Sequence, residues 1–105
     1  MSFFVTITFD LNQAPTSAYP KIQKELENID FSKLISGKRR QDNPLPGNTF
    51  VAEFDNDEFE DDAKSSDVSD YAKSEIKRIF KEHEVSGRYF VAAGKGWSWK
   101  VGTTK

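Results

Sequence analysis

The sequence contains no cysteine and only one histidine. The absence of cysteine excludes disulfide bonds, thiolate zinc sites and cysteine nucleophiles, and it leaves the redox compartment undetermined. A histidine acid–base pair would need a second subunit, because His83 stands alone. His83 falls near the end of a predicted helix, where it can interact with the negative helix terminus, and we interpret it as structural.

Long hydrophobic runs are also absent. No segment approaches the roughly 20 apolar residues that a membrane-spanning helix requires, and the first residues show neither the basic n-region nor the apolar h-region of a signal peptide. We therefore expect a cytoplasmic protein without a membrane partner. Residues 92–96, AAGKG, lack the spacing and the Ser or Thr of a P-loop, so they do not predict a phosphate site of that type.

Aromatic residues, by contrast, are plentiful. The 105 residues include nine Phe, three Tyr and two Trp. Their area can carry a compact core even though 30% of the residues are charged. The length suits one core and is too short for two, so we expect residues 1–105 to form a single domain.

Charge is distributed unevenly along the chain. The net charge of −2 is too small to predict nucleic-acid or membrane binding from bulk electrostatics. The segment from Glu53 to Asp70, however, holds nine carboxylates against Lys64 alone, and the rest of the chain holds 8 carboxylates against 14 Lys and Arg. We therefore expect a surface that is net positive outside this acidic segment.

Hydrophobic periodicity predicts two amphipathic helices. The first spans about residues 17–29, with Thr16 or Ser17 as its N-cap. The second starts after Ser66 as N-cap and is expected to stop at Gly87. Their apolar stripes are Tyr19, Ile22, Leu26 and Ile29 in the first helix, and Val68, Tyr71, Ala72, Ile76, Ile79, Phe80 and His83 in the second.

Alternation of apolar and polar residues predicts strands at 3–10, 31–35, 48–55 and 88–93. The second and third are expected to pair as a hairpin across the loop at 36–47, and WSWKV at 97–101 predicts a further short β segment. The resulting order is that of a ferredoxin-like α+β fold, β-α-β-β-α-β, with an extra short C-terminal β segment. Its helices cover one face of an antiparallel sheet.

The other face of such a sheet is open to partners and ligands. The alternation in the first strand places Phe3, Val5, Ile7 and Phe9 toward the helices and leaves Phe4, Thr6, Thr8 and Asp10 on the open face. Phe4, together with Trp97 and Trp99, would expose apolar area that a symmetric homodimer would cover. The two Trp have a second interpretation as a base-stacking platform, but an intersubunit strand is the favoured one.

Three motifs carry a resemblance to a known group of proteins. They are VTITFD at 5–10, DFSKLIS at 30–36, and NPLPGNTFVAEF at 43–54. In this fold they resemble the ferredoxin-like CRISPR-associated nucleases and their toxin–antitoxin relatives, most closely the GhoS-type antitoxin endoribonucleases. The resemblance covers residues 3–54 and implies a homodimer in which the aspartate that closes the first strand, Asp10, supports metal-dependent cleavage of RNA or DNA.

Taken by itself, one aspartate is a poor Mg²⁺ site. The ion keeps several waters and is held by one or two carboxylates together with substrate phosphates. A two-fold axis would supply the second carboxylate from another copy of Asp10. The alternative is that Asp10 caps the turn that follows it through the local backbone.

The charged segments suggest two classes of partner. Lys38, Arg39 and Arg40 follow one another in the second loop and can hold phosphates without reading bases, although such a run is also typical of a solvated loop. The acidic segment at 53–70 offers an alternative function, a non-catalytic interaction or inhibitor protein that presents its carboxylates to a basic partner. A solubilising loop is the simpler interpretation of the same segment.

Overall fold

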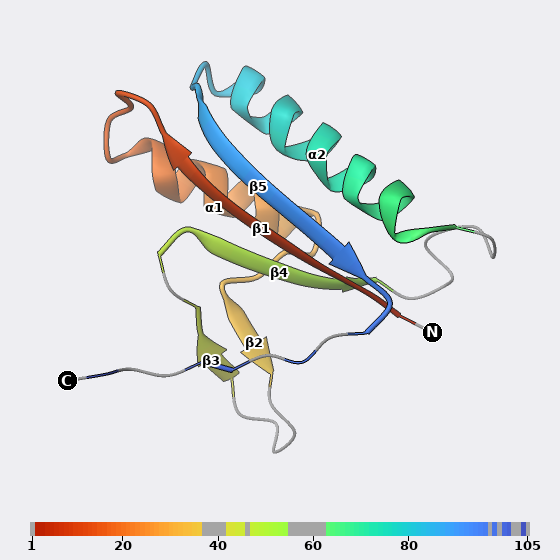
Figure 1. The fold of residues 1–105 in the computed structure, drawn as a ribbon. Coiled ribbons are helices and arrows are strands. Elements are labelled where there is room, and N and C mark those ends of the chain that lie inside the picture. Colours follow the sequence, from red (N-terminus) through yellow and green to blue (C-terminus); the bar gives the residue numbers. More distant parts are fainter. Residues whose placement is uncertain are drawn as a thin grey trace.

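The structure is a computed structural model that describes residues 2–36, 42–45, 47–54, 63–96, 98, 100, 101 and 104. Its elements are β1 (Phe3–Leu11), α1 (Ala18–Asn28), β2 (Leu34–Ser36), β3 (Asp42–Pro44), β4 (Thr49–Phe54), α2 (Ser65–Glu82) and β5 (Gly87–Gly94). This is the predicted ferredoxin-like α+β fold, with one additional short strand between the second and third predicted ones (Figure 1).

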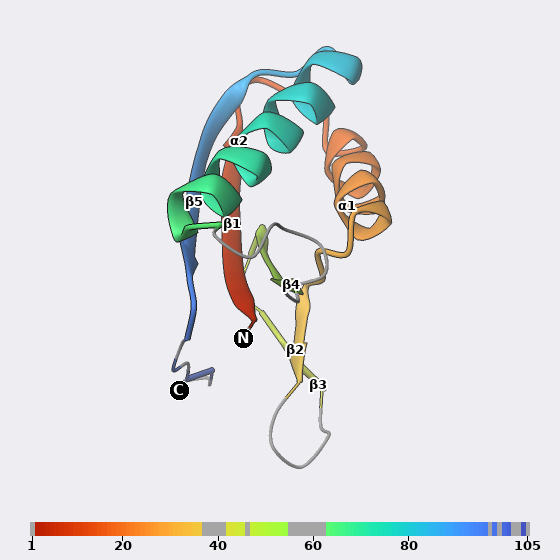
Figure 2. The same cartoon turned by 90° about the vertical axis from the view of Figure 1, so that its right-hand side faces the viewer.

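β1 is the central strand of a three-stranded sheet ordered β4-β1-β5. It pairs antiparallel with both neighbours, so that Ile7 lies opposite Phe50 of β4 and Val91 of β5. Both helices lie on one side of this sheet and leave the other side open (Figure 2). Neither described helix is long and apolar enough to cross a bilayer.

The core lies between the sheet and the helices, on the predicted faces. Phe3, Val5, Ile7 and Phe9 of β1 are all at most 4% exposed. The ring of Phe9 packs against three others, those of Tyr19, Phe50 and Phe80. Burying several Phe, Ile and Leu side chains, each contributing about 1.5–3 kcal/mol, accounts for a packed core in a chain with so many charges. The apolar residues that α1 and α2 bury are Ala18, Ile22, Leu26, Val68, Ala72, Ile76, Ile79 and Phe80.

The second predicted strand divides its pairing between two partners. Ser32 and Val51 exchange both backbone hydrogen bonds, at 2.8 and 2.9 Å, as an isolated antiparallel bridge to β4. The chain then leaves β4, and β2 pairs with β3 as a separate hairpin, which projects beyond the main sheet (Figures 1 and 2). β3 was not predicted because its sequence, Asp-Asn-Pro, has no apolar alternation.

Both helices end in a left-handed residue other than glycine. After α1, Asp30 has φ 72°, and after α2, Glu84 has φ 54°. α2 therefore ends at Glu82, earlier than the predicted stop, and Gly87 begins β5 instead. α2 also begins earlier, because the N-cap is Lys64 rather than Ser66.

The carboxylate of Asp67, in the first turn of α2, accepts a 2.8 Å hydrogen bond from the Lys64 backbone N–H. Trp97 and Trp99, on which the predicted C-terminal β segment depends, lie outside the described residues. The described residues Ser98, Lys100 and Val101 are not part of a strand.

Candidate functional site

The open face of the sheet is built from short rows of side chains that cross the strands. Thr8 of β1 lies between Thr49 of β4 and Phe90 of β5. Two residues further along β1, β4 has already ended, and Asp10 faces only Arg88. The last three residues of β1 therefore pair with β5 alone, and Asp10 lies at a corner of the sheet.

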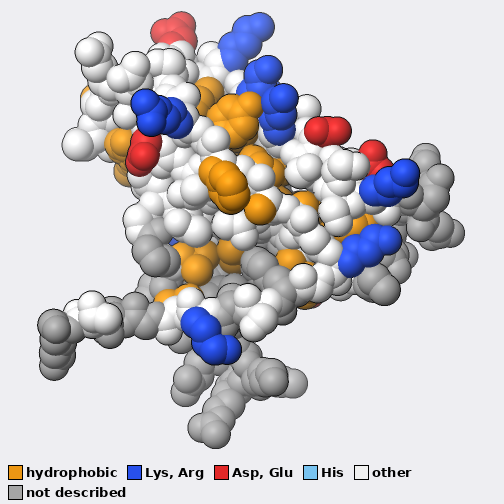
Figure 3. Space-filling model, in the orientation of Figure 1, with side chains coloured by type: hydrophobic (Ala, Val, Ile, Leu, Met, Phe, Trp, Pro, Cys, Tyr) orange, Lys and Arg blue, Asp and Glu red, His pale blue; other side chains and the backbone are white. Residues whose placement is uncertain are grey.

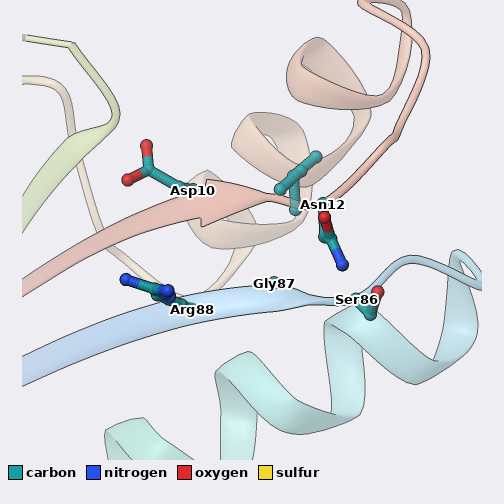
Figure 4. A pocket seen from close by; sticks show the side chains of 6 residues that line it. Asp10, Asn12, Ser86, Gly87 and Arg88 are labelled. Carbon is teal, nitrogen blue, oxygen red and sulfur yellow. The ribbon is translucent and has the colours of Figure 1, made fainter.

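Asp10 is exposed on the open face, as predicted. Its side chain extends from β1 beside that of Arg88 from β5, and both lie toward the same side (Figure 4). Among the described residues, no hydrogen bond or ion pair involves the Asp10 carboxylate, including any to the turn at 11–17. The turn-capping interpretation thus lacks the contact that it requires.

Asp10 and Arg88 border an open pocket of about 460 Å³ at the strand ends. Asn12 and Ser86 lie at its other end, and Gly87 lies on β5 between Arg88 and Ser86 (Figure 4). The lining therefore combines a carboxylate, a guanidinium, an amide and a hydroxyl, groups that together can bind a polar, charged ligand.

Gly87 is required where it stands. A Cβ there would overlap the backbone carbonyl oxygen of Asp10 and would lie 2.9 Å from Cα of Leu11. The strand pair continues one step beyond it, because the Asn12 backbone N–H donates a 2.7 Å hydrogen bond to the Ser86 carbonyl. The backbones of β1 and β5 therefore lie close together at Asp10 and Arg88.

The two described arginines differ in their surroundings. Arg78 of α2 donates hydrogen bonds to Glu75 at 2.8 Å and to Glu82 at 3.0 Å. These bonds, the one to Glu75 first, raise the pKa of Arg78 above its ordinary value. Among the described side chains, no carboxylate lies within 4.0 Å of Arg88. Arg88 is therefore the described arginine that a phosphate can reach without displacing a partner.

The predicted basic run and part of the acidic segment fall outside the described residues. Lys38, Arg39 and Arg40 lie outside the described residues, as do residues 55–62 of the acidic segment. The structure therefore does not locate the basic run relative to Asp10, and its role stays a prediction.

His83 belongs to the helical layer. Its Nε2 atom lies 3.6 Å from a Glu25 carboxylate oxygen of α1, and both side chains are 27% exposed. Its backbone N–H caps α2 through the Ile79 carbonyl at 3.1 Å. These contacts agree with the structural role predicted for it.

A metal site within one chain is not formed by the described residues. No three side chains of the types His, Cys, Asp and Glu come together in this part of the chain. Mg²⁺ is usually held by one or two carboxylates, and substrate phosphates and waters complete its coordination shell. Asp10 supplies one exposed carboxylate. The site fits such an ion only with a further oxygen ligand from outside the described residues.

Sequence reasoning missed Arg88, Asn12 and Ser86. A signal for Arg88 was present, because Arg88, Phe90 and Ala92 alternate with Tyr89, Val91 and Ala93 and so share a face. The register that puts Arg88 opposite Asp10 was not visible, since it joins residues at the two ends of the chain. No local pattern marked Asn12 or Ser86.

The fold and site together define a ferredoxin-like α+β domain with a polar pocket at the ends of its β1–β5 strand pair. No protein-family model matches the chain, and no match is found among curated proteins. The resemblance to CRISPR-associated and toxin–antitoxin nucleases stays a prediction.

Proposed function

We propose that this chain binds nucleic acid at the open end of its β1–β5 strand pair and cleaves phosphodiester bonds there with Mg²⁺. The observation that carries the proposal is the placement of Asp10. It is an exposed carboxylate directly opposite the cation Arg88, at the rim of a polar pocket, and neither side chain has an ion-pair partner among the described residues. A phosphodiester needs a positive charge to hold it and an oxygen ligand for the metal, and this pair supplies one of each.

Arg88 holds the phosphate in this proposal. A guanidinium presents a planar fork of donors that matches the oxygens of a phosphate. It lies on an exposed strand position at the same corner as Asp10, so a phosphate bound to it is also near the carboxylate. The basic run Lys38, Arg39 and Arg40 would add phosphate contacts that fix position without reading sequence.

Asp10 holds the metal together with the same residue of a second copy. In this proposal the second carboxylate comes from another chain, since Asp10 is the one carboxylate among the described residues that line the pocket. Bound Mg²⁺ supplies charge neutralisation at the scissile phosphate. The chain's own contribution is to bind and orient the phosphate through Arg88 and to fix the carboxylate on a rigid strand, in a homodimeric endoribonuclease of toxin–antitoxin or CRISPR-associated type.

The test is cleavage by Asp10→Asn. Asparagine keeps the size and one acceptor oxygen of the side chain but removes its charge. Single-stranded RNA and DNA are incubated with wild type, Asp10→Asn and Asp70→Asn, with Mg²⁺ and with chelator. Asp70 is an exposed aspartate of α2 and serves as the matched control. We expect Mg²⁺-dependent cleavage by wild type and by Asp70→Asn, and a loss of at least about 100-fold in Asp10→Asn, as for removal of one central electrostatic group.

Cleavage that persists with chelator, or in Asp10→Asn, would remove the metal role of Asp10. If wild type binds no nucleic acid at all but captures a basic protein, the alternative function replaces this one. In that case the acidic segment at 53–70 is the part of the chain to replace next.

A further inference from the structure

Phe90 is the one described aromatic side chain that the fold leaves exposed. It is 60% exposed on β5, whereas the described Phe residues of the core are at most 7% exposed. It contributes nothing to the pocket at the strand ends, although it stands only two residues from Arg88 on the same face. An exposed aromatic ring on the open face, next to a cation, is available for contact with a ligand.

The surroundings of Phe90 make it project. Thr8 lies directly opposite on β1, and Ala92 is the next residue of β5 on the same face. Both are small, so no neighbouring side chain covers the ring from the sheet. On its other side β5 is the edge of the sheet. A planar group can therefore approach the ring directly.

A shallow depression continues the same face beyond Phe90. It has a volume of about 220 Å³ and is lined by Phe4, Thr6, Ala92, Ala93, Gly94 and Gly96. From Arg88 to Gly94 the face runs six residues along β5, about 20 Å of extended strand. Along it lie, in order, a cation, a projecting ring and a hollow with an apolar floor.

A cation beside the ring favours an anionic chain as the occupant of this face. Arg88 has no described carboxylate within 4.0 Å, and further Lys and Arg side chains, with some Asp and Glu among them, lie around the hydrophobic side chains near the middle of the face (Figure 3). A ring for stacking with cations beside it is the arrangement that binds single-stranded nucleic acid, since every base has a flat face and every phosphate a negative charge. A duplex offers no unstacked base to such a ring.

We infer that the face along β5 is a binding site for single-stranded nucleic acid, in which a base stacks on Phe90 and the adjacent phosphate binds Arg88. The inference rests on the proposed function and adds the substrate class to it. In this arrangement the nucleic-acid strand lies along the open face, and its phosphate backbone leads into the pocket that Asp10 borders. The bases contribute to the affinity by stacking, whatever their sequence.

The experiment measures fluorescence anisotropy of labelled oligonucleotides of equal length, in Ca²⁺ or chelator so that none is cut; the two single-stranded probes also carry equal charge. The probes are a single-stranded oligonucleotide, the same strand with abasic sites throughout, and a duplex. The proteins are wild type, Phe90→Ala, Phe90→Tyr and Leu34→Ala. Leu34 is an exposed hydrophobic residue of β2, 47% exposed, and is the matched control.

For Phe90→Ala we expect affinity for the single strand to fall by about tenfold or more, the loss that removal of one stacking aromatic causes. Phe90→Tyr and Leu34→Ala should bind like wild type. The abasic strand should bind weakly and equally to wild type and Phe90→Ala. Since Phe90 is exposed, its replacement should leave the thermal unfolding midpoint nearly unchanged.

Equal binding of the abasic and base-carrying strands, or unchanged affinity in Phe90→Ala, would overturn the stacking site while leaving phosphate binding intact. Failure of every probe to bind would overturn the proposed function itself. A Phe90→Ala protein whose sedimentation changes from dimer to monomer would show that a second copy, rather than a base, covers the ring.

Discussion

At the corner of the sheet, a carboxylate and a guanidinium stand on neighbouring strands without a bond between them. Cross-strand pairs of opposite charge contribute only about 0.2–1 kcal/mol, and exposed ion pairs often less. Asp10 and Arg88 can therefore be replaced singly at little cost in stability. Variants at these residues report on binding and cleavage rather than on folding, unlike variants of the neighbouring Gly87, where a Cβ would overlap the Asp10 backbone.

At this scale we predict that Arg88→Gln weakens binding of single-stranded nucleic acid and lowers the salt dependence of that binding. Each neutralised phosphate contributes about 0.7 to the slope of log affinity against log salt for single strands. Anisotropy titrations at several salt concentrations should show a slope reduced by about this amount. Lys73→Gln on α2, an exposed cation in another element, should leave both quantities unchanged. An unaltered slope in Arg88→Gln would show that this arginine contacts no phosphate.

At the scale of elements, both helices end in the same way. The N–H of Phe31 bonds to the Leu26 carbonyl at 3.0 Å, and the N–H of Val85 bonds to the Phe80 carbonyl at 3.0 Å. Each bond spans the left-handed residue of a Schellman motif, in which glycine is the usual choice. Here Asp30 and Glu84 take that position, with φ of 72° and 54°.

Glu84→Gly should therefore stabilise the protein. A non-glycine residue in the left-handed region costs roughly 1–2 kcal/mol. Glycine avoids this cost, but it loses more backbone entropy on folding, which offsets part of the gain. We expect the free energy of unfolding in urea to rise by about 0.5–1 kcal/mol. Lys77→Gly in the exposed middle of α2 should instead lower it by about 1 kcal/mol. A lower stability for Glu84→Gly would mean that the glutamate side chain makes a contribution of its own.

The same two motifs explain where prediction from sequence stopped. The buried faces of β1, α1 and α2 could be predicted, because alternation and helical spacing are visible in short stretches of sequence. The helix ends could not be predicted, because the left-handed positions are occupied by Asp30 and Glu84 and not by glycine, the residue that usually marks them. The exposure of Asp10 was predictable from β1 alone, but its partner Arg88 was not, since the pairing of β1 with β5 depends on the completed sheet.

At the scale of the whole molecule, the way in which two copies associate decides whether Asp10 can share an ion. β5 is an edge of the sheet and could pair with β5 of a second copy. That arrangement would separate the two β1 strands by three strand spacings, about 14 Å. Two carboxylates that bind one Mg²⁺ at about 2.1 Å each cannot be that far apart. A shared ion therefore requires the corner of the sheet at Asp10, and not the β5 edge, to lie at the two-fold axis, with Phe90 left outside the contact between the copies.

We accordingly predict that wild type sediments at micromolar concentration with twice the chain mass of 12.0 kDa. Addition of Mg²⁺ should strengthen the dimer of wild type, because the ion links the two Asp10 carboxylates and favours the associated state. Asp10→Asn should show no such effect, and Asp70→Asn should behave like wild type. A monomer that still cleaves RNA with Mg²⁺ would contradict the shared site.

The position of β1 in the sheet also has a consequence for synthesis of the chain. β1 pairs with β5 over residues such as Phe9 and Tyr89, eighty positions apart. At roughly 5–20 residues per second, a ribosome needs about 4–16 s to make the intervening segment. Until β5 has been made, the apolar side chains of β1, which are Phe3, Val5, Ile7 and Phe9, lack one of the two strands that flank them in the finished sheet.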